Sequence, residues 1–178
     1  MPSATIKIFL PHGDPKRIRT AEISNWSGKA VAGPRTELDK VGVREEADNV
    51  GIYLLTGLDP MSGVPAVYIG EAESVKERLK QHLDKDFWNQ VVFFTSKDEN
   101  LTKAHIRFLE GRVIELARKA GRANLTNSQS TNSRLPESDR ADMEIFLQKI
   151  EQLLPALGVE VLVPIAAKPE SADESRLL

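Results

Sequence analysis

The sequence predicts an α+β protein, an α/β sandwich in which a small, mostly antiparallel sheet of about three strands is flanked by helices. Two short runs, 51–57 and 66–70, are rich in β-branched and aromatic residues and are bounded by glycine, which is typical of strands. A third run, 87–95, is apolar almost throughout and is expected to be a strand buried on both faces. Apolar residues at helical spacing predict helices starting near Ser74, spanning 101–120, and running from Pro136 to a stop at Pro155.

Residues 51–70 form the stretch around which the rest is organised. Each of its two strands carries one tyrosine close to a glycine, Tyr53 and Tyr68, so two phenols are expected on neighbouring strands. The segment 58–65 between them contains prolines and a glycine, which predicts a hairpin loop. In the helix that follows, Val75, Leu79 and Leu83 are the predicted buried stripe. Arg78 and His82 are four residues apart and therefore share one helix face.

We expect four parts along the chain. Residues 1–48 form an N-terminal extension with a β-hairpin (5–10 and 17–23) and a short helix (37–41) capped by Thr36. Residues 49–130 form the central domain, ending in a polar loop at 128–133. Residues 131–165 carry a helix that braces the core and a short strand at 158–164. Residues 166–178 are poor in core-forming residues and predict a flexible tail or a linker to a further C-terminal domain.

Composition limits the possible functions. The 178-residue chain has no cysteine, which excludes disulfides, thiolate metal sites and catalytic thiols. It has no apolar run long enough to span a bilayer and no signal-peptide pattern, so a cytoplasmic protein is expected. The net charge of −2 opposes avid nucleic-acid binding. However, residues 51–126 are near neutral, with eleven Lys/Arg against ten Asp/Glu, so contact with DNA would need a local basic patch.

Glu110 is the informative carboxylate of the long predicted helix. Its neighbours one turn away include Ile106, Val113 and Ile114, which places it at the boundary of an apolar face. A carboxylate that loses water there must find a partner or be neutralised, and a divalent metal ion would be such a partner. A boundary glutamate that simply reaches water is the alternative from the residues alone.

The ordered motifs resemble those of the GIY-YIG nuclease family. Gly51-Ile52-Tyr53 and Tyr68-Ile69-Gly70 match its two name motifs, and Arg78 falls where the family keeps an arginine. The run from Tyr68 to Arg78 is similar to the Y-x-G-x-A-x-x-L-x-x-R pattern of the bacterial excinucleases of this family, which also includes homing endonucleases. The resemblance covers roughly the middle half of the chain and implies the GIY-YIG fold for residues 49–130.

The resemblance also implies a function, a metal-dependent DNA endonuclease. By this likeness Tyr53 is the favoured general base, with Tyr68 as the other phenol, and Arg78 pairs with the scissile phosphate. Glu110 would hold Mg²⁺ or Mn²⁺, and His82 occupies a position where the family has histidine or tyrosine. The family asparagine is either Asn124 or Asn127, which the sequence leaves open. The alternative is a nucleic-acid-binding module that keeps the fold without cleavage; oligomeric state is not predicted.

Overall fold

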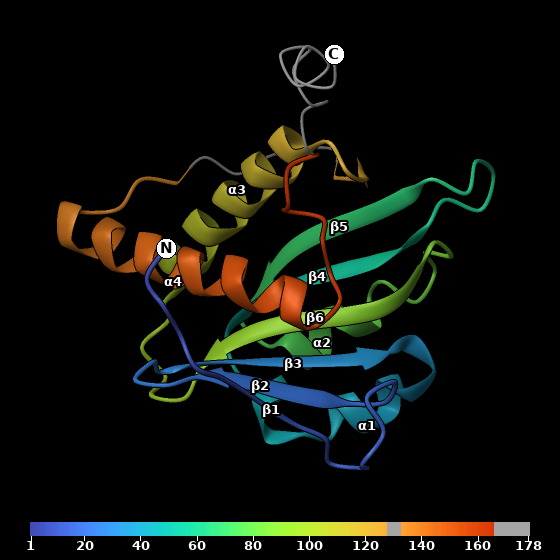
Figure 1. The fold of residues 1–178 in the computed structure, drawn as a ribbon, viewed down its shortest axis with the longest axis horizontal. Coiled ribbons are helices and arrows are strands. Elements are labelled where there is room, and N and C mark those ends of the chain that lie inside the picture. The colour runs from blue at the N-terminus through green and yellow to red at the C-terminus, as the bar shows by residue number, and fades with distance from the viewer. Residues whose placement is uncertain (128–132, 166–178) are drawn as a thin grey trace, which may run out of the picture.

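The computed structural model describes residues 1–127 and 133–165. The predicted tail, 166–178, and residues 128–132 of the predicted polar loop lie outside the described residues. The chain is of the α+β class, as predicted: one sheet with helices on both faces (Figure 1).

The sheet has seven strands, so the prediction of about three strands was wrong. Their order is β1-β2-β3-β6-β4-β5-β7, and every neighbouring pair is antiparallel except β5 and β7. The three predicted strands are present as neighbours within this larger sheet. The N-terminal hairpin is also present, but it continues the same sheet. The bounds are β1 (Ile6–Phe9), β2 (Arg19–Ile23), β3 (Gly28–Pro34), β4 (Gly51–Leu58), β5 (Pro65–Ala72), β6 (Trp88–Ser96) and β7 (Asn124–Leu125).

Strand β3 joins the two halves of the sheet and was not predicted. It consists mainly of glycine and alanine, which are depleted in strands, so local composition does not indicate it. Packing explains one of these small residues: a Cβ atom at Gly28 would overlap the ring of Trp26. Trp26 also packs edge-on against Phe146, with ring centroids 4.9 Å apart, and is therefore the packing anchor of this corner.

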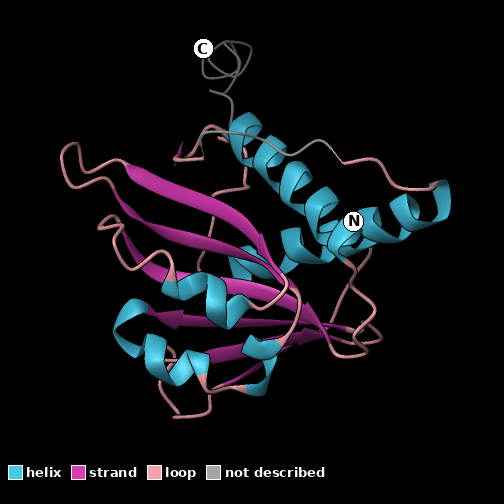
Figure 2. Cartoon of the chain, turned by 180° about the vertical axis from the view of Figure 1, so that it is seen from behind, coloured by secondary structure: helices cyan, strands magenta, loops and turns pink. Residues whose placement is uncertain are grey.

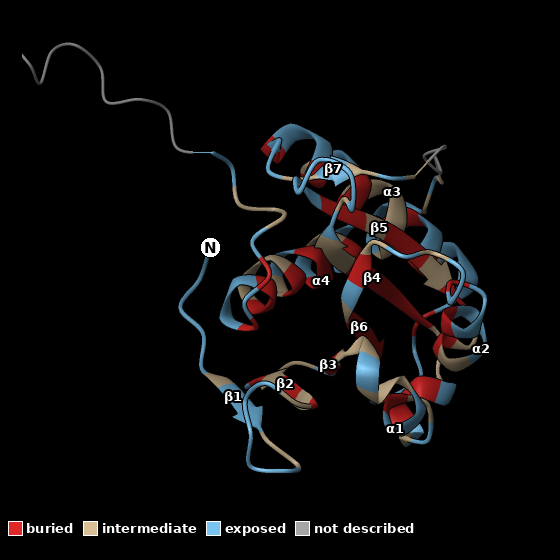
Figure 3. Ribbon diagram, turned by 90° about the vertical axis from the view of Figure 1, so that its right-hand side faces the viewer, coloured by how far each residue is buried: buried red, intermediate tan, exposed pale blue. Residues whose placement is uncertain are grey.

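The helices form two unequal layers. The long helices α3 (Lys103–Ala120) and α4 (Glu137–Ala156) cover one face of the sheet (Figure 1). The short helices α1 (Leu38–Gly42) and α2 (Val75–Lys80), with the 3₁₀ turns η1 (Arg35–Glu37) and η2 (Glu45–Asp48), cover the other (Figure 2). The central strands β4 and β6 are buried between the layers, whereas β1 at the edge is largely exposed (Figure 3).

Helix α3 matches the helix predicted over 101–120 closely, and each of its ends has a clear local cause. The Thr102 side chain caps its first turn, where the His105 side chain completes a capping box. Gly121 ends it in the left-handed conformation, with φ of 66°. His105 also contacts Asp139 of α4 at 3.1 Å.

Four local predictions were wrong. Leu83 is exposed because α2 ends at Lys80, before the expected stripe is complete. Thr36 caps neither η1 nor α1. Pro155 lies inside α4, which ends one residue later. Residues 158–164 form turns, because the Val159 amide bonds back to the end of α4 instead of to a strand.

Among the described residues, no helix has the length and apolar character to cross a bilayer.

Candidate active site

Two tyrosines lie side by side on the face of the sheet that α2 covers. Strands β4 and β5 pair so that Tyr53 is opposite Gly70 and Tyr68 is opposite Leu55. The two rings are roughly parallel, with centroids 6.2 Å apart. A Cβ atom at Gly70 would overlap the Tyr53 ring, so the glycine of the second motif makes room for the tyrosine of the first. Tyr53 is 1% exposed, whereas Tyr68 is half-buried and reaches the surface.

His82 completes a cluster of three rings. Its Nε2 lies 2.7 Å from the Tyr53 hydroxyl, and its ring centroid is 4.6 Å from that of Tyr68. Burial, with the nearby charges of Lys85 and Arg78, lowers the pKa of His82 to about 4. The imidazole is therefore neutral at pH 7 and shares a hydrogen bond with the phenol. Its Nδ1 is buried and has no hydrogen-bond partner in the part of the chain that the structure describes.

The two phenols differ in acidity as well as in exposure. Burial raises the pKa of Tyr53 far above its usual range, with a further contribution from Tyr68. Burial also raises the pKa of Tyr68, but a hydrogen bond from Tyr53 opposes this effect. Tyr68 is therefore the phenol that can meet solvent or a ligand.

Arg78 and Glu110 act on both phenols from different helices. The charge of Arg78, in the last turn of α2, lowers the pKa of Tyr53 and of Tyr68, and the charge of Glu110, on α3, raises both. Arg78 is exposed and lines a hollow of about 240 Å³ next to the site. Glu110 is half-buried, in keeping with its predicted place at the boundary of an apolar face. Of the seven predicted site residues, Tyr53, Tyr68 and His82 are thus in ring contact, and Arg78 and Glu110 act on the two phenols through their charges.

The two candidate asparagines behave differently. Asn127 is bound to the backbone of Ile69, between the tyrosine and glycine of the second motif. Its Oδ1 accepts from the Ile69 amide at 2.9 Å and its Nδ2 donates to the Ile69 carbonyl at 2.6 Å. Asn124 is exposed and pairs with Ala66 through the short parallel contact of β7 with β5. Asn127 therefore holds the strand of Tyr68, whereas Asn124 lies opposite Ala66 near the start of that strand.

Lys85 lies over the site and was not predicted from the sequence. Its Nζ is 5.1 Å from the centroid of the Tyr68 ring. Arg35 and Trp88, also not predicted, hydrogen-bond to the backbone around it. No local pattern marks these residues, because Arg35 reaches its partners across about fifty positions of the chain.

The donor groups near the rings are few for a divalent cation. The described residues contain no group of three or more His, Cys, Asp or Glu side chains arranged to hold a metal ion. Mg²⁺ is commonly bound by one or two carboxylates, with water and substrate phosphate as the remaining ligands. A single carboxylate, Glu110, near two phenols and an arginine fits such a weak, substrate-assisted site and does not fit a preformed metal cage.

Comparisons with protein-family models, with curated proteins and with solved structures returned no match for this chain.

Proposed function

We propose that this protein is a metal-dependent DNA endonuclease with a site of the GIY-YIG type. The observation that carries the proposal is the convergence of Tyr53, Tyr68 and His82 in one ring cluster, with the charges of Arg78 and Glu110 both acting on the two phenols. Phosphodiester hydrolysis needs a proton acceptor for the attacking water, positive charge at the phosphate and stabilisation of the leaving oxygen. These five side chains have the chemistry for all three tasks.

Tyr68, and not Tyr53, is assigned the role of proton acceptor. Tyr53 was the expected base from the resemblance, but it is almost fully buried and its hydroxyl is engaged by His82. Tyr68 reaches the surface, and the hydrogen bond from Tyr53 favours its ionised form. In this assignment His82 orients Tyr53, and Tyr53 in turn supports the charge that develops on Tyr68.

Arg78 is assigned to the scissile phosphate, because its planar guanidinium suits two phosphate oxygens and its side chain is exposed. Glu110 would hold Mg²⁺ or Mn²⁺. The negative charge of Glu110 raises the pKa of both phenols. A cation bound to Glu110 would offset this charge and so make Tyr68 easier to ionise. When bound, a divalent cation supplies positive charge at the leaving oxygen. Asn127 keeps the Tyr68 strand in place.

The test is cleavage of supercoiled plasmid and branched DNA with Mg²⁺ or Mn²⁺. We expect Glu110→Gln to lower the cleavage rate on the order of 10²- to 10³-fold, the loss typical of removing one charge-stabilising group. The matched control is Glu115→Gln on the same helix, whose exposed carboxylate pairs with Arg112. Equal cleavage by wild type and Glu110→Gln would rule the proposal out.

A second candidate is a nucleic-acid-binding module that does not cleave. The observation in its favour is the acidic surround of Arg78: Glu71, Glu73 and Glu77 line the same hollow, which disfavours a scissile phosphate at Arg78 without opposing DNA contacts elsewhere on the protein. This candidate predicts salt-sensitive DNA binding with no cleavage in any divalent metal ion. The plasmid assay therefore separates the two.

A further inference from the structure

The segment 82–88, between the end of α2 and the start of β6, is held by two side chains. The Trp88 indole Nε1–H donates to the His82 carbonyl at 3.0 Å. The Arg35 guanidinium donates to the carbonyl oxygens of Leu83 at 2.6 Å, of Lys85, and of Trp88 at 3.3 Å. Four of the seven carbonyls in the segment are thus hydrogen-bonded to side chains, although only His82 and Trp88 among its residues are buried.

The guanidinium of Arg35 is itself fixed. Its central carbon lies 4.4 Å from the centroid of the Trp88 ring, and Trp88 is 1% exposed. A planar fork of five N–H donors can serve several carbonyls at once, which a lysine ammonium could not do in the same geometry. Ordering a turn in this way costs conformational entropy. The turn carries two side chains that reach the site, His82 and Lys85.

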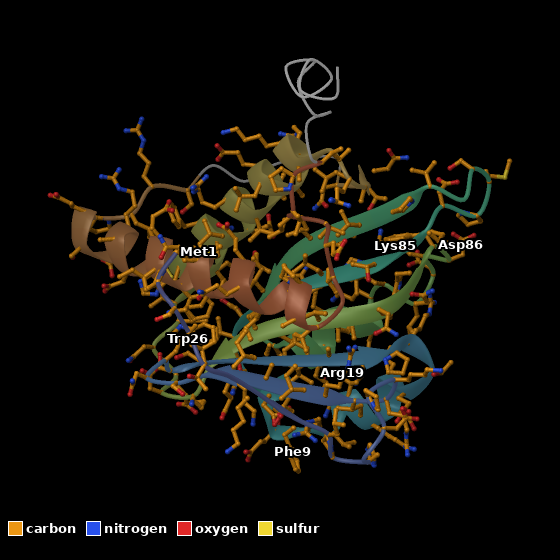
Figure 4. All side chains as sticks on the ribbon, viewed as in Figure 1. Met1, Phe9, Arg19, Trp26, Lys85 and Asp86 are labelled. Carbon is orange, nitrogen blue, oxygen red and sulfur yellow. The ribbon has the colours of Figure 1, made fainter. Side chains whose placement is uncertain are left out.

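Lys85 is positioned to meet an anion. Its Nζ lies over the ring of Tyr68, the phenol that reaches the surface, and the residue is itself only partly buried. Its sequence neighbours, Asp84 and Asp86, are exposed, and Figure 4 shows Lys85 and Asp86 near the outer end of the sheet. Lys85 and Arg78 both act electrostatically on the imidazole of His82. Two cationic side chains therefore lie near the ring cluster: Arg78 from α2 and Lys85 from the segment 82–88.

We propose that Lys85 binds a backbone phosphate of the DNA strand next to the one that Arg78 binds, and that Arg35 is the positioning residue that fixes Lys85 over Tyr68. This inference rests on the proposed function, since it names a second contact of the same site with DNA. Phosphate contacts of this kind fix the register of a nucleic acid on a protein without reading its sequence. A lysine already held near its binding position loses less conformational freedom on binding.

The experiment measures affinity for a short DNA duplex by fluorescence anisotropy, in EDTA so that no cleavage occurs, between about 50 and 200 mM salt. Each phosphate contact contributes roughly 0.9 to the slope of log affinity against log salt. Lys85→Gln should flatten this slope by about 0.9 and weaken binding on the order of tenfold at about 0.1 M salt. The matched control is Lys7→Gln, which makes the same charge change on the exposed edge strand β1 and should leave the slope unchanged.

Arg35→Lys tests the positioning role, because it keeps the charge and removes the planar fork. We expect its slope to flatten as in Lys85→Gln, and the double variant to lose no more than either single variant. Circular dichroism and thermal melting show whether Arg35→Lys folds. If it does not fold, the salt slope of Lys85→Gln alone tests the phosphate contact. Additive losses in a folded double variant would remove Arg35 from the proposal.

Equal slopes for Lys85→Gln and Lys7→Gln would overturn the assignment of Lys85. If the wild type binds DNA through Lys85 but cuts none with Mg²⁺ or Mn²⁺, the nuclease proposal fails and the phosphate contact stands. If the wild type binds no DNA in EDTA, the Lys85 proposal fails, and the plasmid assay with Mg²⁺ or Mn²⁺ still decides the nuclease proposal. The two failures are therefore distinguishable.

Discussion

The two faces of the sheet have different chemistry. The face under α3 and α4 packs aliphatic and phenylalanine side chains from nearly every strand against the two long helices, and it holds the larger core. The face under α1 and α2 has a smaller core that includes Tyr53 and Trp88 and borders the half-buried Tyr68. Because side chains alternate along a strand, Leu54 faces the first layer while Tyr53 and Leu55 face the second.

The two faces also differ in the polar groups that they bury. The smaller layer holds a buried phenol and an imidazole nitrogen with no hydrogen-bond partner among the described residues, whereas the larger layer is built from apolar side chains. Such groups cost stability, and in the proposed function they lie beside the charges that are assigned to phosphate. Changes on the α2 face should therefore affect chemistry first, and changes on the α3/α4 face should affect stability first.

The largest effect should come from Tyr68→Phe, compared with Tyr53→Phe. Removing the surface phenol should lower the cleavage rate on the order of 10³-fold, about 4 kcal/mol, with little loss of stability. Tyr53→Phe should lower the rate about tenfold and cost about 1 kcal/mol of stability, because His82 Nε2 loses its hydrogen bond. Single-turnover cleavage and urea unfolding measure the two quantities. A larger rate loss in Tyr53→Phe than in Tyr68→Phe would mean that Tyr53, and not Tyr68, is the proton acceptor.

The next effect is on the opposite face. Leu147 on α4 is 1% exposed within the larger core, so Leu147→Ala should lower the free energy of unfolding by about 3 kcal/mol. The cleavage rate of the folded protein, measured well below its melting temperature, should stay within about twofold of wild type, since the sheet separates this side chain from the phenols. A rate loss comparable to that of Tyr68→Phe would show that the two faces are not separable.

A third effect links pH to the smaller core. The pKa of His82 is about 4 in the folded protein and about 6.5 when unfolded. Between these values the unfolded state binds a proton that the folded state does not. The free energy of unfolding should therefore fall as pH drops from about 6.5 to about 4, by about 2 kcal/mol from this residue.

His82→Gln should remove this part of the pH dependence in urea unfolding at about pH 7, 5 and 4. An unchanged pH dependence in His82→Gln would mean that the imidazole is not buried as a neutral group.

The parts of the molecule that could be predicted from the sequence are those with local causes. The paired glycines and tyrosines predicted β4 and β5, and the apolar residues at helical spacing predicted α3. Strand β3 was not predicted because its buried alanines and glycines have weak intrinsic strand preference, and because the ring of Trp26 requires a glycine at position 28 only in the folded protein. Arg35 and Lys85 were not predicted for a related reason: their roles come from contacts between segments that are distant in the sequence.

The smallest effect resolves the choice between the two asparagines. Asn127→Ala removes both side-chain hydrogen bonds to the Ile69 backbone and should cost about 1.5 kcal/mol of stability. The rate of cleavage should also fall a few-fold, because the strand that carries Tyr68 is no longer held by these two hydrogen bonds. Asn124→Ala, at an exposed position of β7, should cost less than about 0.5 kcal/mol. Urea unfolding of the two variants makes the comparison. A larger loss in Asn124→Ala would mean that the hydrogen bonds of Asn127 do not hold the tyrosine strand.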